Sequence, residues 1–254
     1  MDSRHPKTIE PFFVNSIAKS GTHLLKQLIE GIPSIKHYDS IYQGTYPLQY
    51  QKYKTILSNI PPNHFVNGHL YYSRQYMGLF NSLNLKQIFL YRDPRDIVVS
   101  YAYFFMKLKN NPTRRFFVEN NYDVKGRCVA LINGFECGYV SRMNINDWYR
   151  QFLGWKYANN VLPISYESLV ESSKSQKKVL MNMIRFLNIE NVPGYMKLTA
   201  KEMQNSVQPQ KSPTYRKGKS GDWKVEFDDA TKDQFKKVAG DLLIELGYEK
   251  DYNW

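Results

Sequence analysis

The sequence alternates between short apolar runs and amphipathic segments, and this order constrains the fold more than any other feature. Segments typical of strands occur at 11–17, 64–70 and 86–91, and at the start of 161–170. A segment with apolar residues at helical spacing follows each of the first three. Strands that alternate with helices form a parallel sheet with helices on both faces. We therefore expect a three-layer α/β/α fold around a central parallel β-sheet.

Further elements and the domain organisation follow from the same spacing. Helical segments are expected at 112–160, 174–188 and 229–246. The stretch 33–62 is rich in tyrosine and shows no clear period. A chain of 254 residues fits one domain, so a single domain over 1–254 is expected.

Composition indicates the compartment but leaves the partner open. No apolar run reaches the ~18 residues of a membrane span, and the polar N-terminus lacks a signal-peptide pattern. With only Cys128 and Cys137, we expect reduced thiols and a cytoplasmic protein. Lysine and arginine exceed aspartate and glutamate by 35 to 23, a net charge of +12. This excess indicates either an anionic partner or simply a solvated basic surface.

The turn between the first strand and its helix has the composition of an anion site. If the helix begins at Thr22, the amides of its first turn point into the loop, where a partial positive charge favours an anion. Lys19 adds a full charge. In common NTPase loops the lysine follows the glycines, whereas Lys19 precedes Gly21. Taken alone, the segment is either a binding site for a phosphate-like group or an ordinary turn between a strand and a helix.

Two other segments place cationic groups where the chain turns. Arg92 ends a strand and Ser100 follows eight residues later in a helix. This pair could hold a phosphate, or Arg92 could instead form an ion pair with Asp96. The segment 215–224, YRKGKSGDWK, is basic and contains two glycines, so it could fold over a phosphate. A solvated run of charges is the alternative for this segment.

Together these segments resemble motifs of the cytosolic-type sulfotransferases, which use 3′-phosphoadenosine 5′-phosphosulfate (PAPS). AKSGTHLL is similar to the family's 5′-phosphosulfate loop, YRDPRDIVVSYAYF to its 3′-phosphate motif, and RKGKSGDWK to its Arg-Lys-Gly-x-x-Gly-Asp-Trp-Lys segment. The motifs also agree in order and spacing, and the resemblance covers residues 10–246. It implies a P-loop-like fold and transfer of a sulfuryl group to a hydroxyl or amine, leaving 3′-phosphoadenosine 5′-phosphate (PAP).

The resemblance also implies roles for individual residues. His69 corresponds to the catalytic base, with His23 as the alternative, and Lys19 to the group that neutralises the leaving group. Ser100 corresponds to a serine that binds the 3′-phosphate and restrains this lysine. A basic loop at 207–224 is expected to cover PAPS. The implied PAPS-binding residues are Lys19, Ser20, Gly21, Thr22, His23, Arg92, Ser100, Tyr166, Arg216, Lys217 and Gly218.

Several positions depart from the family pattern. Leu24 and Ala200 stand where relatives stack aromatic residues on adenine, and Tyr166 is the expected hydrogen-bond partner of adenine. Asn67 replaces a lysine that in many relatives contacts the sulfuryl oxygens. The family's dimer signature is not reproduced after Lys224, so the usual dimer is not expected and the oligomeric state stays open.

The expected partner is a small-molecule acceptor, such as a microbial secondary metabolite, rather than a nucleic acid or a membrane. No metal is expected, because a sulfuryl group carries less charge than a phosphoryl group and no carboxylate cluster is evident. Two alternatives stay open. One is a non-catalytic protein that binds nucleotides or polyanions. The other is an ATP-dependent kinase of related fold, although the sequence has no Gly-x-x-x-x-Gly-Lys-[Ser/Thr] motif.

Overall fold

The computed structural model describes residues 8–42, 48–189, 195–212 and 215–254. The chain divides into two compact units. The first, here called the sheet unit, comprises Met1–Tyr91 and Phe152–Gly218; the second, the helical unit, comprises Arg92–Gln151 and Lys219–Trp254. Each unit is described by itself, and the expectation of a single domain over 1–254 stays a prediction.

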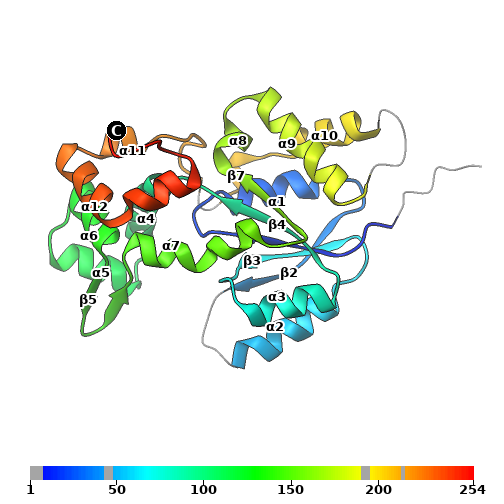
Figure 1. Cartoon of the computed structure of the whole chain (residues 1–254), viewed down its shortest axis with the longest axis horizontal. Helices are drawn as coiled ribbons and strands as arrows, with labels where there is room; N and C mark the ends of the chain where they lie inside the picture. Colours follow the sequence, from blue (N-terminus) through cyan, green and yellow to red (C-terminus); the bar gives the residue numbers. More distant parts are fainter. Residues whose placement is uncertain (1–7, 43–47, 190–194, 213–214) are drawn as a thin grey trace, which may run out of the picture. The chain divides into compact units, whose positions relative to one another are not determined.

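The sheet unit is built on five parallel strands in the order β2-β3-β1-β4-β7 (Figure 1). Their bounds are β1 Phe12–Ser16, β2 Lys36–Tyr42, β3 His64–His69, β4 Lys86–Tyr91 and β7 Val161–Ser165. β1 lies in the middle, paired with β3 and β4, and all of its residues are buried. The parallel sheet and all four expected strands are confirmed.

Helices cover both faces of this sheet, as expected (Figure 1). On one face lie α1 Thr22–Glu30, α8 Tyr166–Val170, α9 Ser173–Phe186 and α10 Tyr195–Asn205. On the other lie α2 Leu48–Ser58 and α3 Arg74–Ser82. A short 3₁₀ helix, η1 Gly154–Tyr157, precedes β7, and another, η2 Pro209–Lys211, follows α10.

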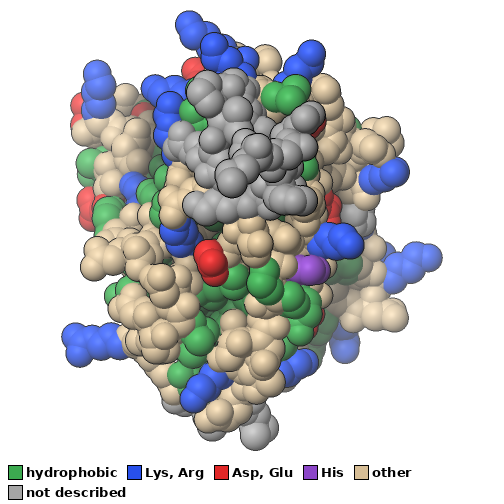
Figure 2. Space-filling model, turned by 90° about the vertical axis from the view of Figure 1, so that its right-hand side faces the viewer, with side chains coloured by type: hydrophobic (Ala, Val, Ile, Leu, Met, Phe, Trp, Pro, Cys, Tyr) green, Lys and Arg blue, Asp and Glu red, His purple; other side chains and the backbone are tan. Residues whose placement is uncertain are grey.

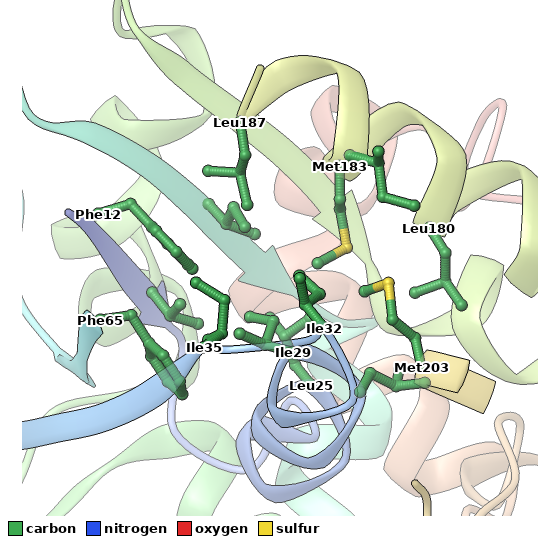
Figure 3. Packing of buried hydrophobic residues seen from close by; sticks show 14 of the residues in the cluster. Phe12, Leu25, Ile29, Ile32, Ile35, Phe65, Leu180, Met183, Leu187 and Met203 are labelled. Atoms are coloured by element: carbon green, nitrogen blue, oxygen red, sulfur yellow. The ribbon is translucent and has the colours of Figure 1, made fainter. Parts of the chain in front are cut away.

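Alternation along β1 supplies side chains to both faces of the sheet. Phe12 and Val14 join a buried cluster with residues of α1, α9 and α10, and Figure 3 shows Phe12, Leu25 and Met183 within it. Phe13 points the other way and packs on Phe80 of α3, with ring centroids 5.3 Å apart. Burial of each such side chain contributes about 1.5–3 kcal/mol. The end of β1, where the first loop begins, is therefore firmly anchored.

The helical unit contains six helices among the residues described. They are α4 Pro94–Lys107, α5 Pro112–Glu119, α6 Val124–Asn133, α7 Ile145–Leu153, α11 Trp223–Glu226 and α12 Asp229–Leu246. The expectation of a helix throughout 112–160 is wrong at the hairpin β5 Phe135–Cys137 and β6 Val140–Arg142. Gly134 ends α6 with a positive φ of 72°, which glycine adopts without strain and which breaks the helix. Cys128 and Cys137 form no disulfide.

The stretch 33–62, which shows no period in the sequence, contains β2 and α2. The pairing register of β2 shifts between His37 and Asp39, so the alternation that would reveal a strand is interrupted. β2 also lies at the edge of the sheet, where few of its residues are buried. Among the described helices of the chain, none is both long and apolar enough to cross a membrane.

Candidate functional site

The loop after β1 has an unusual backbone that is tied to the centre of the sheet. Lys19 and Gly21 both adopt positive φ, 73° and 100°. Between them, Ser20 is buried, and its Oγ donates to the carbonyls of Ile17 at 2.5 Å and Leu90 at 3.2 Å. Left-handed conformations on both sides of Ser20 curl the backbone into a tight turn. The turn therefore has a defined shape that two neighbouring strands support.

Amide donors and cationic groups gather where this loop enters α1. Gly21 is the N-cap and has no side chain to cap the helix, and amides of a first helical turn have no acceptor within the helix. Partial burial lowers the pKa of His23, and the charges of Lys19 and Lys26 lower it further. The loop is therefore electropositive and rich in donors, which suits an anionic group.

Tyr166, the first residue of α8, closes one side of this loop. A Cβ added at Gly21 would lie only 2.5 Å from Cδ2 of the buried Tyr166 ring. Only glycine therefore fits at position 21, both for its φ and for this contact. The implied hydrogen bond from Tyr166 to adenine stays a prediction.

Gly21→Ala should lower the free energy of unfolding by more than about 1–2 kcal/mol, the cost of a left-handed alanine, because the Tyr166 ring must also move. Thermal or urea unfolding measures this change. Gly78→Ala in α3 is the control, since a Cβ there meets no atom within 4 Å. It should raise stability by about 0.4–1 kcal/mol. An equal effect of the two substitutions on stability would contradict the conclusion that only glycine fits at position 21.

His69 is the last residue of β3, and its ring is oriented by the end of β1. The Nδ1 atom lies 2.8 Å from the backbone carbonyl oxygen of Ser16 and 3.1 Å from its Oγ. A carbonyl can only accept, so Nδ1 carries the proton and Nε2 of the neutral ring carries the lone pair. The fold therefore presents His69 as a base at Nε2.

Ser16 also connects His69 with the loop. Its Oγ lies 2.7 Å from Oγ1 of Thr22, the first residue of α1. One hydroxyl thus contacts both the His69 ring and the N-terminus of α1. Nothing in the sequence singles out Ser16, because its partner His69 lies 53 positions away.

The surroundings keep His69 neutral. Burial lowers the pKa of His69 below its ordinary value of 6.5. The hydrogen bond to Ser16 opposes this shift, whereas the nearby charges of His23 and Lys19 add to it. A neutral imidazole near pH 7 is the form that accepts a proton.

Asn67, two residues before His69, is fixed by the neighbouring strand. Parallel pairing places Ser40 of β2 beside Asn67 and Tyr42 beside His69. The Ser40 Oγ donates to Asn67 Oδ1 at 2.9 Å and lies 3.2 Å from Nε2 of His37. With Oδ1 engaged, the Nδ2 group is the donor that Asn67 can offer. The Tyr42 ring, about half exposed, lies 5.5 Å from the His69 ring, centroid to centroid.

The two positions that lack the family's adenine-stacking aromatics belong to the core. Ala200 of α10 is fully buried in the apolar cluster, and Leu24 packs against that cluster. Both side chains therefore serve the packing of α1 and α10 on the sheet.

The basic segment is partly described. Pro213 and Thr214, within the loop predicted at 207–224, lie outside the described residues. Arg216 is half-buried and Lys217 is exposed. Gly218 and Gly221 have φ of 66° and 85°, so both serve as left-handed pivots, as their spacing suggested.

Arg92 and Ser100 lie in the helical unit. Arg92 is buried, and its Nη2 donates to Asp96 Oδ2 at 3.1 Å and to the carbonyl of Lys219 at 3.0 Å. The ion pair with Asp96, raised as an alternative from the sequence, is therefore present. Ser100 is half-buried in α4, two helical turns further on. Of the implied PAPS-binding residues, these two belong to the helical unit and the others to the sheet unit.

Charge on the surface is dispersed on the face shown in Figure 2. There the Lys and Arg side chains project at separate places rather than in one stripe. Among the residues that the structure covers, no three His, Cys, Asp or Glu side chains gather as a metal-binding group.

Comparison with known proteins decides the family. The model of the sulfotransferase domain matches residues 10–247, nearly the whole chain. This chain belongs to the sulfotransferase family. The order of its three motifs therefore reflects shared ancestry rather than coincidence.

Two mammalian sulfotransferases illustrate the relationship. The chain is 27% identical over 212 residues to Sulfotransferase 1 family member D1 of Mus musculus, a match that covers 75% of this chain and 64% of that protein. It is 30% identical over 174 residues to Sulfotransferase 1E1 of Rattus norvegicus, covering 61% and 53%. The matched region is thus less than two thirds of either relative.

Solved structures show the same fold. Mouse sulfotransferase SULT7A1, complexed with PAP, is similar with a TM-score of 0.61 at 21% identity, over 92% of this chain and 84% of that one. Retinol dehydratase, in complex with androsterone and the inactive cofactor PAP, has a TM-score of 0.57 at 17% identity, over 92% and 80%. At such identities the likeness concerns the fold.

Proposed function

We propose that this sulfotransferase moves a sulfuryl group from PAPS to a hydroxyl or amine of a small-molecule acceptor. The observation that carries the proposal is the position of Ser16, whose hydroxyl lies 2.7 Å from Thr22 Oγ1 and 3.1 Å from His69 Nδ1. An electropositive, donor-rich loop and an oriented base therefore lie side by side. Membership of the sulfotransferase family and the PAP in two proteins of the same fold support it.

The loop suits the phosphosulfate end of this co-substrate. PAPS supplies the activated sulfuryl group. Lys19 and the amides of Ser20, Gly21, Thr22 and His23 would stabilise negative charge that develops on the leaving oxygen. Because Gly21 has no Cβ, the backbone can approach an anion closely.

His69 would act as the general base. Its Nε2 would accept the proton of the acceptor hydroxyl or amine, and the imidazolium formed would be held by the Ser16 carbonyl at Nδ1. Asn67 Nδ2 could donate to a sulfuryl oxygen. Ser100 would both bind the 3′-phosphate and restrain Lys19.

The 3′-phosphate is assigned to cationic and hydroxyl groups. By their positions in the motifs, these are Arg92, Ser100, Arg216, Lys217 and Gly218. Arginine suits this role because its planar fork can donate two parallel hydrogen bonds to phosphate. Tyr166 is proposed to contact adenine.

Calorimetry of nucleotide binding tests the proposal. Wild-type protein at physiological salt should bind PAP at least about tenfold more tightly than 5′-AMP or ATP, a preference of about 1.4 kcal/mol. Arg92→Ala should remove this preference. Arg150→Ala, which breaks an exposed ion pair with Glu245 in the same unit, should keep it. Equal binding of PAP and 5′-AMP by the wild type would sink the proposal, and tighter binding of ATP would favour a kinase.

The pH dependence of kcat/KM follows from the state of His69. Protonation removes the base, so activity should fall as the pH drops through the pKa of His69. Because burial lowers this pKa below 6.5, the midpoint of the fall in activity should lie below pH 6.5. A pH profile of kcat/KM measures the midpoint. An acidic limb centred above 6.5 would contradict the assigned environment of His69.

A further inference from the structure

Asp96 forms a buried junction in the first turn of α4. Its residue is only 1% exposed, and both carboxylate oxygens are engaged. Oδ2 accepts from Nη2 of Arg92 at 3.1 Å and from the amide of Gly221 at 2.8 Å. Oδ1 accepts from the amide of Trp223 at 3.1 Å. One carboxylate thus binds the side chain of Arg92, just before α4, and two backbone amides that lie more than 120 positions later.

The spacing of the motif explains why this junction lies at position 96. Arg92 lies just before α4, which begins at Pro94, and its side chain pairs with Asp96 in the first turn of that helix. Ser100 lies one further turn along α4, because residues four apart are neighbours on one helix face. Asp96 therefore lies midway in the interval of eight between Arg92 and Ser100.

The segment Lys219–Trp223, here called the docking segment, is held by further contacts from the same turn. Arg92 Nη2 also donates to the carbonyl of Lys219 at 3.0 Å. The guanidinium of Arg95 stacks on the Trp223 ring, 3.7 Å from its centroid. Arg95 is itself paired with Asp93 at 2.7 Å. The docking segment follows Arg216, Lys217 and Gly218 directly in the chain.

We propose that Asp96 is a positioning residue that makes binding of a 3′-phosphate and docking of this segment depend on each other. This inference rests on the proposed function, in which Arg92 binds the 3′-phosphate. Asp96 does not touch the nucleotide. It holds the Arg92 fork and ties the docking segment to it, so ligand binding need not supply the free energy of ordering the segment. Without the carboxylate, nucleotide binding would have to supply that free energy, and the Kd for PAP would rise.

A purely structural role for Asp96 makes a different prediction. Loss of the junction would then lower stability but leave the preference among nucleotides unchanged. Asp93 provides a comparison, because it is also a buried carboxylate in the same turn and pairs with Arg95, whose guanidinium stacks on Trp223.

Calorimetry with Asp96→Asn and Asp93→Asn separates the two roles. Asp96→Asn should weaken PAP binding by about tenfold and leave 5′-AMP binding nearly unchanged, so that the preference for PAP is lost. Asp93→Asn, which affects the docking segment through Arg95 and its stacking on Trp223, should lower the Tm and reduce the preference by less than Asp96→Asn does. A full preference in Asp96→Asn, or an equal loss in both variants, would overturn the inference. If the wild type itself shows no preference, the proposed function fails instead.

Hydrogen exchange on the wild type tests the coupling even if Asp96→Asn does not fold. Saturating PAP should slow exchange in peptides that contain the Gly221 and Trp223 amides by at least about tenfold more than saturating 5′-AMP. Peptides from α12 serve as the internal reference. Equal protection of the docking segment by the two nucleotides would show that the 3′-phosphate and the segment are not coupled, which overturns the proposal.

Discussion

Replacing His69 with asparagine should reduce kcat by about 10²–10⁴-fold, the contribution of a positioned general base. Asparagine can still donate a hydrogen bond toward Ser16, but it has no basic nitrogen to accept the acceptor's proton. Affinity for PAP should change by less than about twofold, because the base acts on the acceptor rather than on the nucleotide. Steady-state kinetics with PAPS and an acceptor that the wild type sulfates measure kcat, and calorimetry measures the Kd for PAP.

The matched control for this substitution is His64→Asn at the start of the same strand. Its Nδ1 atom lies 2.9 Å from the Pro62 carbonyl oxygen, so it also contacts a backbone oxygen, but at the opposite end of β3. The His64→Asn variant should keep nearly full activity. A similar loss of kcat in both variants would show that the effect arises from β3 rather than from base chemistry. If His69→Asn stayed fully active, His23 would become the candidate base.

Replacing Lys19 with methionine should lower kcat by about 10²–10³-fold, comparable to removing one donor from an oxyanion site. The reason is that charge on the leaving oxygen is larger in the transition state than in the bound nucleotide, so a cation there favours the transition state. The Kd for PAP should rise by less than the factor lost in kcat. Methionine has a length similar to lysine and must adopt the same φ of 73°. The free-energy cost of this backbone conformation is therefore nearly the same in the variant and the wild type.

The control for Lys19 is Lys26→Met on α1. Lys26 also lowers the pKa of His23, but it lies further along the helix and pairs with Glu30 at 3.9 Å. Removing its charge tests whether any loss of positive charge near the loop is enough to lower kcat. Equal losses of kcat in the two variants, or a loss in Lys19→Met that appears only in Kd, would contradict a transition-state role.

Strong local patterns made most of the sheet predictable. β1, β3 and β4 each contain a short apolar run, at 12–14, 65–66 and 88–91, because parallel strands are buried on both faces. The failures occur where that physical signal is absent. β2 is an exposed edge strand with a register shift, and the β5–β6 hairpin has only three residues in each strand.

The features of the candidate site also divide into those that the sequence predicts and those that only the structure shows. The sequence by itself determined the family, and it placed Lys19 and Gly21 in the turn before a helix and Arg92 eight positions before Ser100, because such motifs consist of neighbours along the chain. Only the tertiary structure decided which nitrogen of His69 is free, that Ser16 joins it to the loop, and that Asp96 meets the Gly221 amide. The contacts of His69 with Ser16 and of Asp96 with Gly221 join residues more than 50 positions apart, and pairing of parallel strands and docking of a distant segment bring them together. A local pattern carries no record of such partners, since their distances depend on how the elements pack.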